Sequence, residues 1–78
     1  MKEKLHNLLR QINKKIPEDT SANLLTGDIL DSLDIIRIVA EMEKGFDVVI
    51  QPKDIVPKNF ESVDAIFKLL NSHVDNKL

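Results

Sequence analysis

Apolar residues recur with helical spacing near both ends of the chain. Between residues 2 and 15 a single apolar face predicts an amphipathic helix, which ends at Pro17 because proline cannot continue a helix. From residue 63 onward a similar face predicts the last helix, with Ser62 as its N-cap. The first face consists of Leu5, Leu8, Leu9, Ile12 and Ile16, and the last face consists of Val63, Ile66, Phe67, Leu70 and Val74.

Residues 33–46 predict a central helix that carries two apolar faces. One face consists of Ile35, Ile38, Val39, Met42 and Phe46, and the other consists of Leu33, Ile36 and Ala40. At ~100° per residue the two faces lie on roughly opposite sides of the helix. One apolar face is enough to reach a core, so the helix is either buried all round or exposes its second face. Charged residues flank the second face, which favours an exposed patch for a partner; they are Arg37, Glu41, Glu43 and Lys44.

The start of the central helix predicts a capping box. Asp31 is a favourable N-cap residue, and Asp34 lies three positions later, where its carboxylate can reach back to the Asp31 backbone. Ser32 then occupies the first helical position, among backbone N–H groups that favour an anion. A phosphate ester on Ser32 would be well placed, although the two carboxylates oppose it in part. Capping alone also explains the motif, so both interpretations stay open.

The connections around the central helix are predicted to be ordered. Residues 17–30 form a long loop, which four apolar residues can pin to the core: Leu24, Leu25, Ile29 and Leu30. Gly45 is expected to close the central helix, with Phe46 as a hydrophobic plug behind it. Residues 48–50 are β-branched, but no second strand is available to pair with them, so an extended connector is expected.

A short third helix is predicted between two prolines. Pro52 suits its first turn, and the helix is expected to run through Val56 and to stop at Pro57. Ile55, Val56 and Phe60 are expected to pack inward. The sequence therefore predicts an all-α fold, and 78 residues allow a single domain spanning 1–78.

Composition and charge argue against several classes of function. The net charge of −2 argues against a nucleic-acid-binding protein, and no apolar run is long enough to span a membrane. The first residues are charged and amphipathic, and the chain has no cysteine, so a cytoplasmic location is expected. His6 and His73 are the only histidines, which gives no metal-site pattern. Ser32 lacks the glycine-flanked turn of a hydrolase nucleophile, so catalysis by this chain is not expected.

The motif Leu30-Asp31-Ser32-Leu33-Asp34, the apolar helix after it, and Phe46-Asp47 with Ile50 resemble the acyl carrier protein family. The resemblance extends over nearly the whole chain, including residues 59–66 at the start of the last helix. It implies a four-helix bundle with a long first loop and a short third helix. It also implies that a phosphopantetheinyl transferase attaches 4′-phosphopantetheine from coenzyme A to Ser32, which Asp31 flanks. The chain would then be a monomeric carrier of an acyl or aminoacyl thioester, and not an enzyme.

The resemblance further implies a docking surface on the central helix, made of Leu33, Ile36, Arg37 and Ala40. Carriers of fatty-acid synthesis are usually much more acidic than this chain, and Arg37 and Lys44 interrupt their acidic pattern. We therefore expect a specialised ligase or synthase as the partner. The alternatives are a carrier for fatty-acid synthesis, a carrier of aminoacyl groups including the D-alanyl type, and an unmodified helical module that binds a partner through its apolar patch.

Overall fold

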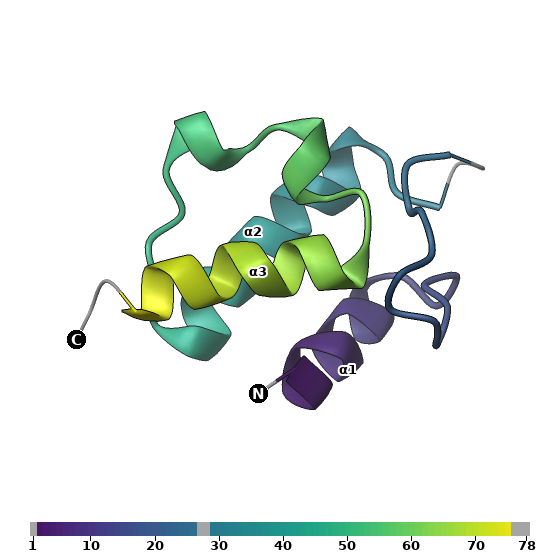
Figure 1. Cartoon of the computed structure of the whole chain (residues 1–78), viewed down its shortest axis with the longest axis horizontal. Coiled ribbons are helices and arrows are strands. Elements are labelled where there is room, and N and C mark those ends of the chain that lie inside the picture. Colours follow the sequence, from purple (N-terminus) through teal and green to yellow (C-terminus); the bar gives the residue numbers. More distant parts are fainter. Residues whose placement is uncertain (1, 27–28, 76–78) are drawn as a thin grey trace.

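The computed structural model describes residues 2–26 and 29–75, and side chains up to residue 73. This part of the chain contains three α-helices and no strand, which confirms the predicted all-α class. The helices are α1 (Lys2–Ile12), α2 (Ser32–Phe46) and α3 (Val63–Asp75); two 3₁₀ turns, η1 (Pro52–Asp54) and η2 (Pro57–Asn59), precede α3. Figure 1 shows α3 crossing in front of α2, with the two turns linking them.

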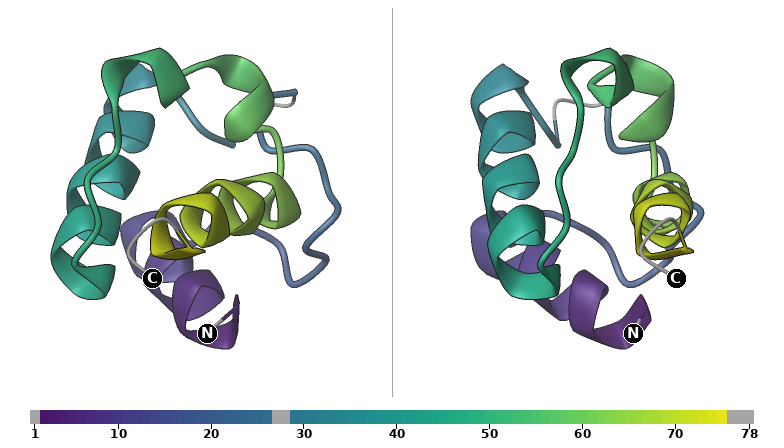
Figure 2. Two further views of the ribbon diagram at one scale, coloured as in Figure 1. Left: turned by 60° about the vertical axis from the view of Figure 1, so that its left-hand side comes forward. Right: turned by 90° about the vertical axis from the view of Figure 1, so that its left-hand side faces the viewer.

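The core lies between the three helices, and apolar residues of the connecting segments are also buried in it. Figure 2 shows α2 and α3 on opposite sides of the molecule, with the connector after α2 running back along that helix. This path returns η1 to the neighbourhood of the start of α2. The buried apolar residues are Leu5, Leu9, Ile16, Leu24, Leu30, Ile38, Met42, Val48, Ile50, Phe60, Val63, Ile66, Leu69 and Leu70.

Backbone hydrogen bonds hold the long first loop to the start of α3. The structure describes residues 17–26, 29 and 30 of this loop. The backbone N–H of Leu24 donates to the carbonyl oxygen of Glu61 (2.7 Å), and the N–H of Asp64 donates to the carbonyl oxygen of Thr20 (2.9 Å). Leu24 and Leu30 are buried, while Leu25 and Ile29 pack partly buried against the core, which confirms the predicted pinning. Residues 27 and 28 of this predicted loop lie outside the described residues.

The first helix is shorter than its apolar face. It ends at Ile12 and not at residue 15, because the Asn13 side chain accepts a hydrogen bond from the backbone N–H of Lys15 (2.9 Å). A side chain that bonds to nearby backbone in this way competes with the helix. Ile16 is nevertheless buried, although it lies beyond the end of the helix. The predicted burial of Ile16 is therefore confirmed, whereas the predicted helix end was wrong.

The end of α2 differs from the prediction at Gly45. The helix continues through Gly45 and Phe46, and the left-handed residue that follows it is Asp47 (φ 53°, ψ 51°). A Cβ atom on Gly45 would lie 3.3 Å from Leu8 Cδ1, so the glycine allows close approach of α1 to the last turn of α2. Residues 48–50 form the expected extended connector, and the Ile50 N–H donates to the Glu43 carboxylate (2.9 Å).

The predicted short helix from Pro52 through Val56 is wrong. The segment forms two 3₁₀ turns instead, and Pro57 begins the second turn rather than ending a helix. Val56 has an extended backbone (φ −126°, ψ 151°), because the ring of a following proline disfavours the helical conformation. Phe60 is buried as predicted, but Ile55 and Val56 are 42% and 39% exposed and do not enter the core.

The last helix begins as predicted. The Ser62 hydroxyl oxygen accepts a hydrogen bond from the Ala65 N–H (3.0 Å), which confirms its N-cap role. Val63, Ile66 and Leu70 are buried, Phe67 is half-buried, and Leu69 joins the core although the spacing did not single it out. The side chain of Val74 lies outside the described part. No helix in the described ranges is long and apolar enough to cross a membrane.

The segment 51–60 should exchange its amide hydrogens faster than α2. Each of its four turn hydrogen bonds reaches back only three residues, as in the bond from Phe60 N–H to Pro57 carbonyl oxygen (2.9 Å). Short turns of this kind depend on tertiary packing, here mainly on Phe60, and open more readily than a long central helix. Hydrogen exchange followed by mass spectrometry tests this, and exchange as slow as that of residues 35–46 would contradict it.

Candidate functional site

Ser32 lies at the first helical position of α2, with its side chain exposed. The preceding residue, Asp31, is the N-cap and has an extended backbone (φ −114°, ψ −177°). Its carboxylate oxygen Oδ1 accepts the Asp34 N–H (2.8 Å), and the Asp31 N–H donates to Asp34 Oδ2 (3.4 Å). The predicted capping box is therefore confirmed. Among the described residues nothing hydrogen-bonds to the Ser32 hydroxyl, so this group is not used by the cap.

A polar side chain from the end of α1 fixes the start of α2. Asn13 Nδ2 donates to Asp34 Oδ2 (3.1 Å) and to the carbonyl oxygen of Ile29. The N-terminal turn of α2 is thus held both by its own capping box and by a residue 21 positions earlier in the sequence. Sequence reasoning missed Asn13; its only signal is an amide side chain directly after the last helical residue, between the apolar positions Ile12 and Ile16.

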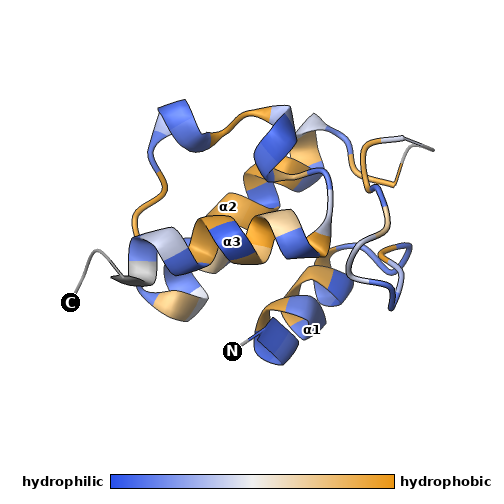
Figure 3. Ribbon diagram, viewed as in Figure 1, coloured by the Kyte–Doolittle hydropathy of each residue, from blue (hydrophilic) through white to orange (hydrophobic). Residues whose placement is uncertain are grey.

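An apolar groove of ≈ 430 Å³ lies beside Ser32. It is formed by three segments that are distant in the sequence: the long loop, the first two turns of α2, and the stretch from the link between η1 and η2 to Phe60. Figure 3 shows that this link is hydrophobic. The lining residues are Leu25, Ser32, Ile35, Ile36, Ile55, Val56, Pro57 and Phe60, of which Ser32 alone is polar. The serine hydroxyl therefore stands at the edge of a surface suited to an apolar group.

The second apolar face of α2 is exposed. Leu33 and Ile36 are 57% and 63% exposed, and Arg37 and Ala40 are also exposed, whereas Ile38 and Met42 on the other side are fully buried. The alternative of a helix buried all round is therefore wrong. Large exposed apolar side chains gathered on one helix face are typical of a surface that meets a partner. This face begins directly after Ser32, so the hydroxyl and the exposed face form one continuous region.

The two histidines contact other parts of the molecule. His6 Nε2 donates to the carbonyl oxygen of Pro17 (2.8 Å), where the first helix has ended, and His73 Nε2 pairs with Asp54 Oδ2 (3.0 Å) between α3 and η1. Neither partner is part of the Ser32 region. Within the described ranges no three or more histidine, aspartate or glutamate side chains come together in a group that could hold a metal ion.

Comparison of the chain with protein-family models, with curated proteins and with solved structures finds no match. The residues of the site themselves therefore carry the information about its function. Its chemistry consists of one exposed hydroxyl at a helix N-terminus, an apolar groove beside it, and an exposed helix face next to both.

Proposed function

We propose that Ser32 is the attachment site of 4′-phosphopantetheine and that the chain is a carrier of acyl or aminoacyl groups. The observation that carries this proposal is the placement of its hydroxyl. It is exposed, has no hydrogen-bond partner among the described residues, and stands at the first position of α2 beside the apolar groove. A bulky phosphodiester attached there can extend into solvent without displacing any packed side chain.

The local electrostatics support a phosphodiester at this position. The backbone N–H groups of the first turn and the helix macrodipole favour negative charge at the N-terminus of α2. The Asp31 and Asp34 carboxylates oppose it, but each accepts a backbone hydrogen bond in the capping box, and Asp34 also accepts one from Asn13. These hydrogen bonds offset part of the negative charge next to Ser32.

The attachment reaction needs a separate enzyme. A phosphopantetheinyl transferase would form an ester bond between Ser32 Oγ and the phosphate of 4′-phosphopantetheine. The pyrophosphate bond of coenzyme A would break, adenosine 3′,5′-bisphosphate would leave, and the hydroxyl proton would be released. The attached group supplies a terminal thiol that can hold a thioester. The chain itself has no cysteine and so depends on the attached group for this chemistry. In this proposal the chain is a substrate of other enzymes, and not itself an enzyme.

The proposal includes a finer description of the fold. We infer that η1 and η2 occupy the place of the short third helix in a four-helix bundle of the acyl-carrier type. The exposed residues Leu33, Ile36, Arg37 and Ala40 would form the docking surface for the transferase and for a specialised ligase or synthase. The carrier would act as a cytoplasmic monomer that binds neither nucleic acid nor membrane.

Intact-protein mass spectrometry tests the modification. The purified chain is incubated with coenzyme A, Mg²⁺ and a promiscuous phosphopantetheinyl transferase. We expect a mass gain of one phosphopantetheinyl group on most molecules. If no mass gain occurs while a known carrier is modified in the same tube, the carrier function is wrong. The exposed Leu33 and Ile36 would then favour the alternative, an unmodified module that binds a partner protein.

A further inference from the structure

The outermost line of α2 carries two positive charges and no negative charge. Leu33, Arg37, Ala40 and Lys44 are spaced i, i+4, i+7 and i+11, and at ~100° per residue they fall within about 60° of one another. All four side chains are exposed. We call this line the crest of α2. The whole chain is net negative, so the positive charge of the crest is a local feature.

The acidic residues of α2 lie to the sides of the crest. Glu43 is half-buried, and its carboxylate accepts the Ile50 N–H (2.9 Å) on the side of the connector. Glu41 is exposed on the side of α1, where it lines a surface groove with Leu8 and Gln11 and with two crest residues, Arg37 and Ala40. No ion pair within the described part of the chain involves Arg37 or Lys44, whereas Lys2 pairs with Asp64 and Arg10 pairs with Glu18.

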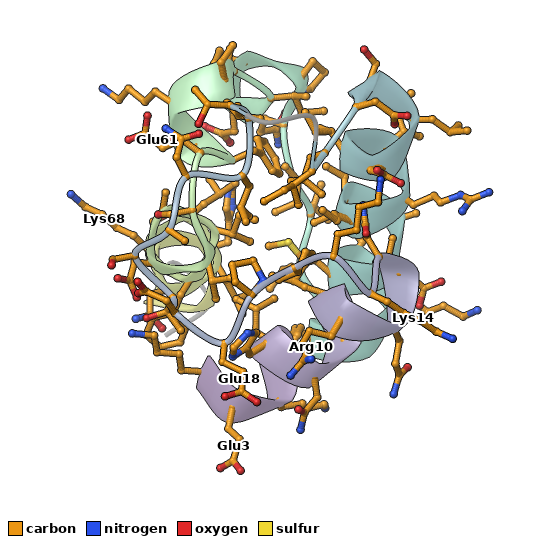
Figure 4. The ribbon with its side chains drawn as sticks, turned by 90° about the vertical axis from the view of Figure 1, so that its right-hand side faces the viewer. Glu3, Arg10, Lys14, Glu18, Glu61 and Lys68 are labelled. Carbon is orange, nitrogen blue, oxygen red and sulfur yellow. The ribbon has the colours of Figure 1, made fainter. Side chains whose placement is uncertain are left out.

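The end of α1 adds positive charge near the start of the crest. Asn13 contacts Asp34 in the first turn of α2. Lys14 is the next residue in the sequence, so its backbone lies close to the start of this helix. Figure 4 shows Lys14 pointing outward on the same side of the molecule as α2, while Lys68 points outward on the opposite side. The acidic residues nearest Ser32, Asp31 and Asp34, are both engaged in the capping box.

We propose that the enzyme that uses this carrier presents acidic residues to the crest, around an apolar contact with Leu33 and Ile36. This inference rests on the proposed function, because it assigns the partner of the same Ser32 site. Unpaired, exposed cations next to an apolar patch are complemented by carboxylates on the partner and oppose a basic surface. Charge arranged in this way raises the association rate of the right partner and slows that of a wrong one.

The test uses one probe enzyme in two charge states. The probe is an elongating ketosynthase whose carrier-docking surface is basic, together with a variant whose basic docking residues are replaced by glutamate. Both enzymes are first assayed with a small acyl-pantetheine thioester. The kcat/KM of each enzyme with the carrier is then divided by its kcat/KM with this small thioester, which corrects for differences in intrinsic activity. The carrier is loaded with phosphopantetheine and an acyl group, and loading is verified by intact mass. The measured quantity is kcat/KM for acyl transfer from the carrier.

We expect the natural carrier to prefer the acidic ketosynthase variant by roughly two- to tenfold at low ionic strength, since two exposed charges are involved. The preference should shrink at high salt. The double substitution Arg37→Glu with Lys44→Glu should reverse the preference. A matched control makes the same change of charge elsewhere: Lys58→Glu with Lys68→Glu, two exposed residues at a groove between η2 and α3, should leave the preference unchanged.

Two results would overturn the inference while leaving the carrier function intact. One is equal normalised kcat/KM for the two ketosynthases at low salt with a fully loaded carrier. The other is a control pair that changes the preference as much as the crest pair does. Failure of the carrier to gain mass at the loading step is a different result. It overturns the proposed function, and with it the inference that depends on it.

Discussion

The Ser32→Ala variant should gain no mass with coenzyme A and transferase, while its helical circular dichroism and its stability stay close to those of the natural chain. The hydroxyl is the proposed attachment atom, so its removal abolishes the reaction outright. The fold does not depend on it, because Asp31 and Asp34 form the cap and Ser32 is exposed without a hydrogen-bond partner among the described residues. An exposed substitution of this kind changes stability by about 0.5 kcal/mol or less.

Ser62→Ala is the matched control for this variant. Ser62 caps α3 through its hydroxyl, so the same substitution should cost about 0.5–2 kcal/mol of stability and leave the mass gain intact. The two serines thus separate the two roles of a serine at a helix start. A mass gain that survives Ser32→Ala would place the modification on another residue, and loss of the mass gain in Ser62→Ala would show that the assay reports folding.

The features of the site that rest on local sequence could be predicted. The capping box needs only Asp31 and Asp34 three positions apart, and the structure confirms both hydrogen bonds. Helical periodicity likewise predicted the second apolar face of α2, and the charged residues beside it favoured exposure, but only the structure excludes a helix that is buried all round. The prediction of a short third helix was wrong for a reason that is also local in sequence. Val56 precedes a proline and takes an extended conformation.

The features that depend on distant segments could not be predicted. Asn13 reaches Asp34 across 21 positions, and no periodicity links the two residues. Gly45 looked like a helix end, whereas its role in the structure is the close approach to Leu8. The groove beside Ser32 forms only when the connector after α2 runs back along the helix and brings Ile55 and Val56 to its start. Such contacts are set by tertiary packing, which local propensity does not specify.

The largest loss of stability is expected for Met42→Ala. Met42 is fully buried in the core on the inner side of α2. Replacing a buried methionine with alanine leaves a cavity and costs about 2–5 kcal/mol. Small domains have total stabilities of about 5–15 kcal/mol, so this single change removes a large share. Urea unfolding measures it as a lower midpoint with an unchanged slope, provided the variant is still folded without denaturant.

Ile36→Glu tests the other side of the same helix. Ile36 is 63% exposed, so the free energy of unfolding should fall by only about 0.5 kcal/mol. Its modification by the transferase should nevertheless slow, because a charge replaces an apolar contact within the proposed docking surface. Initial rates of mass gain, measured beside the urea midpoint, separate the two effects. If Ile36→Glu lowers the midpoint as much as Met42→Ala does, both sides of α2 support the core, and the exposed face is not available for docking.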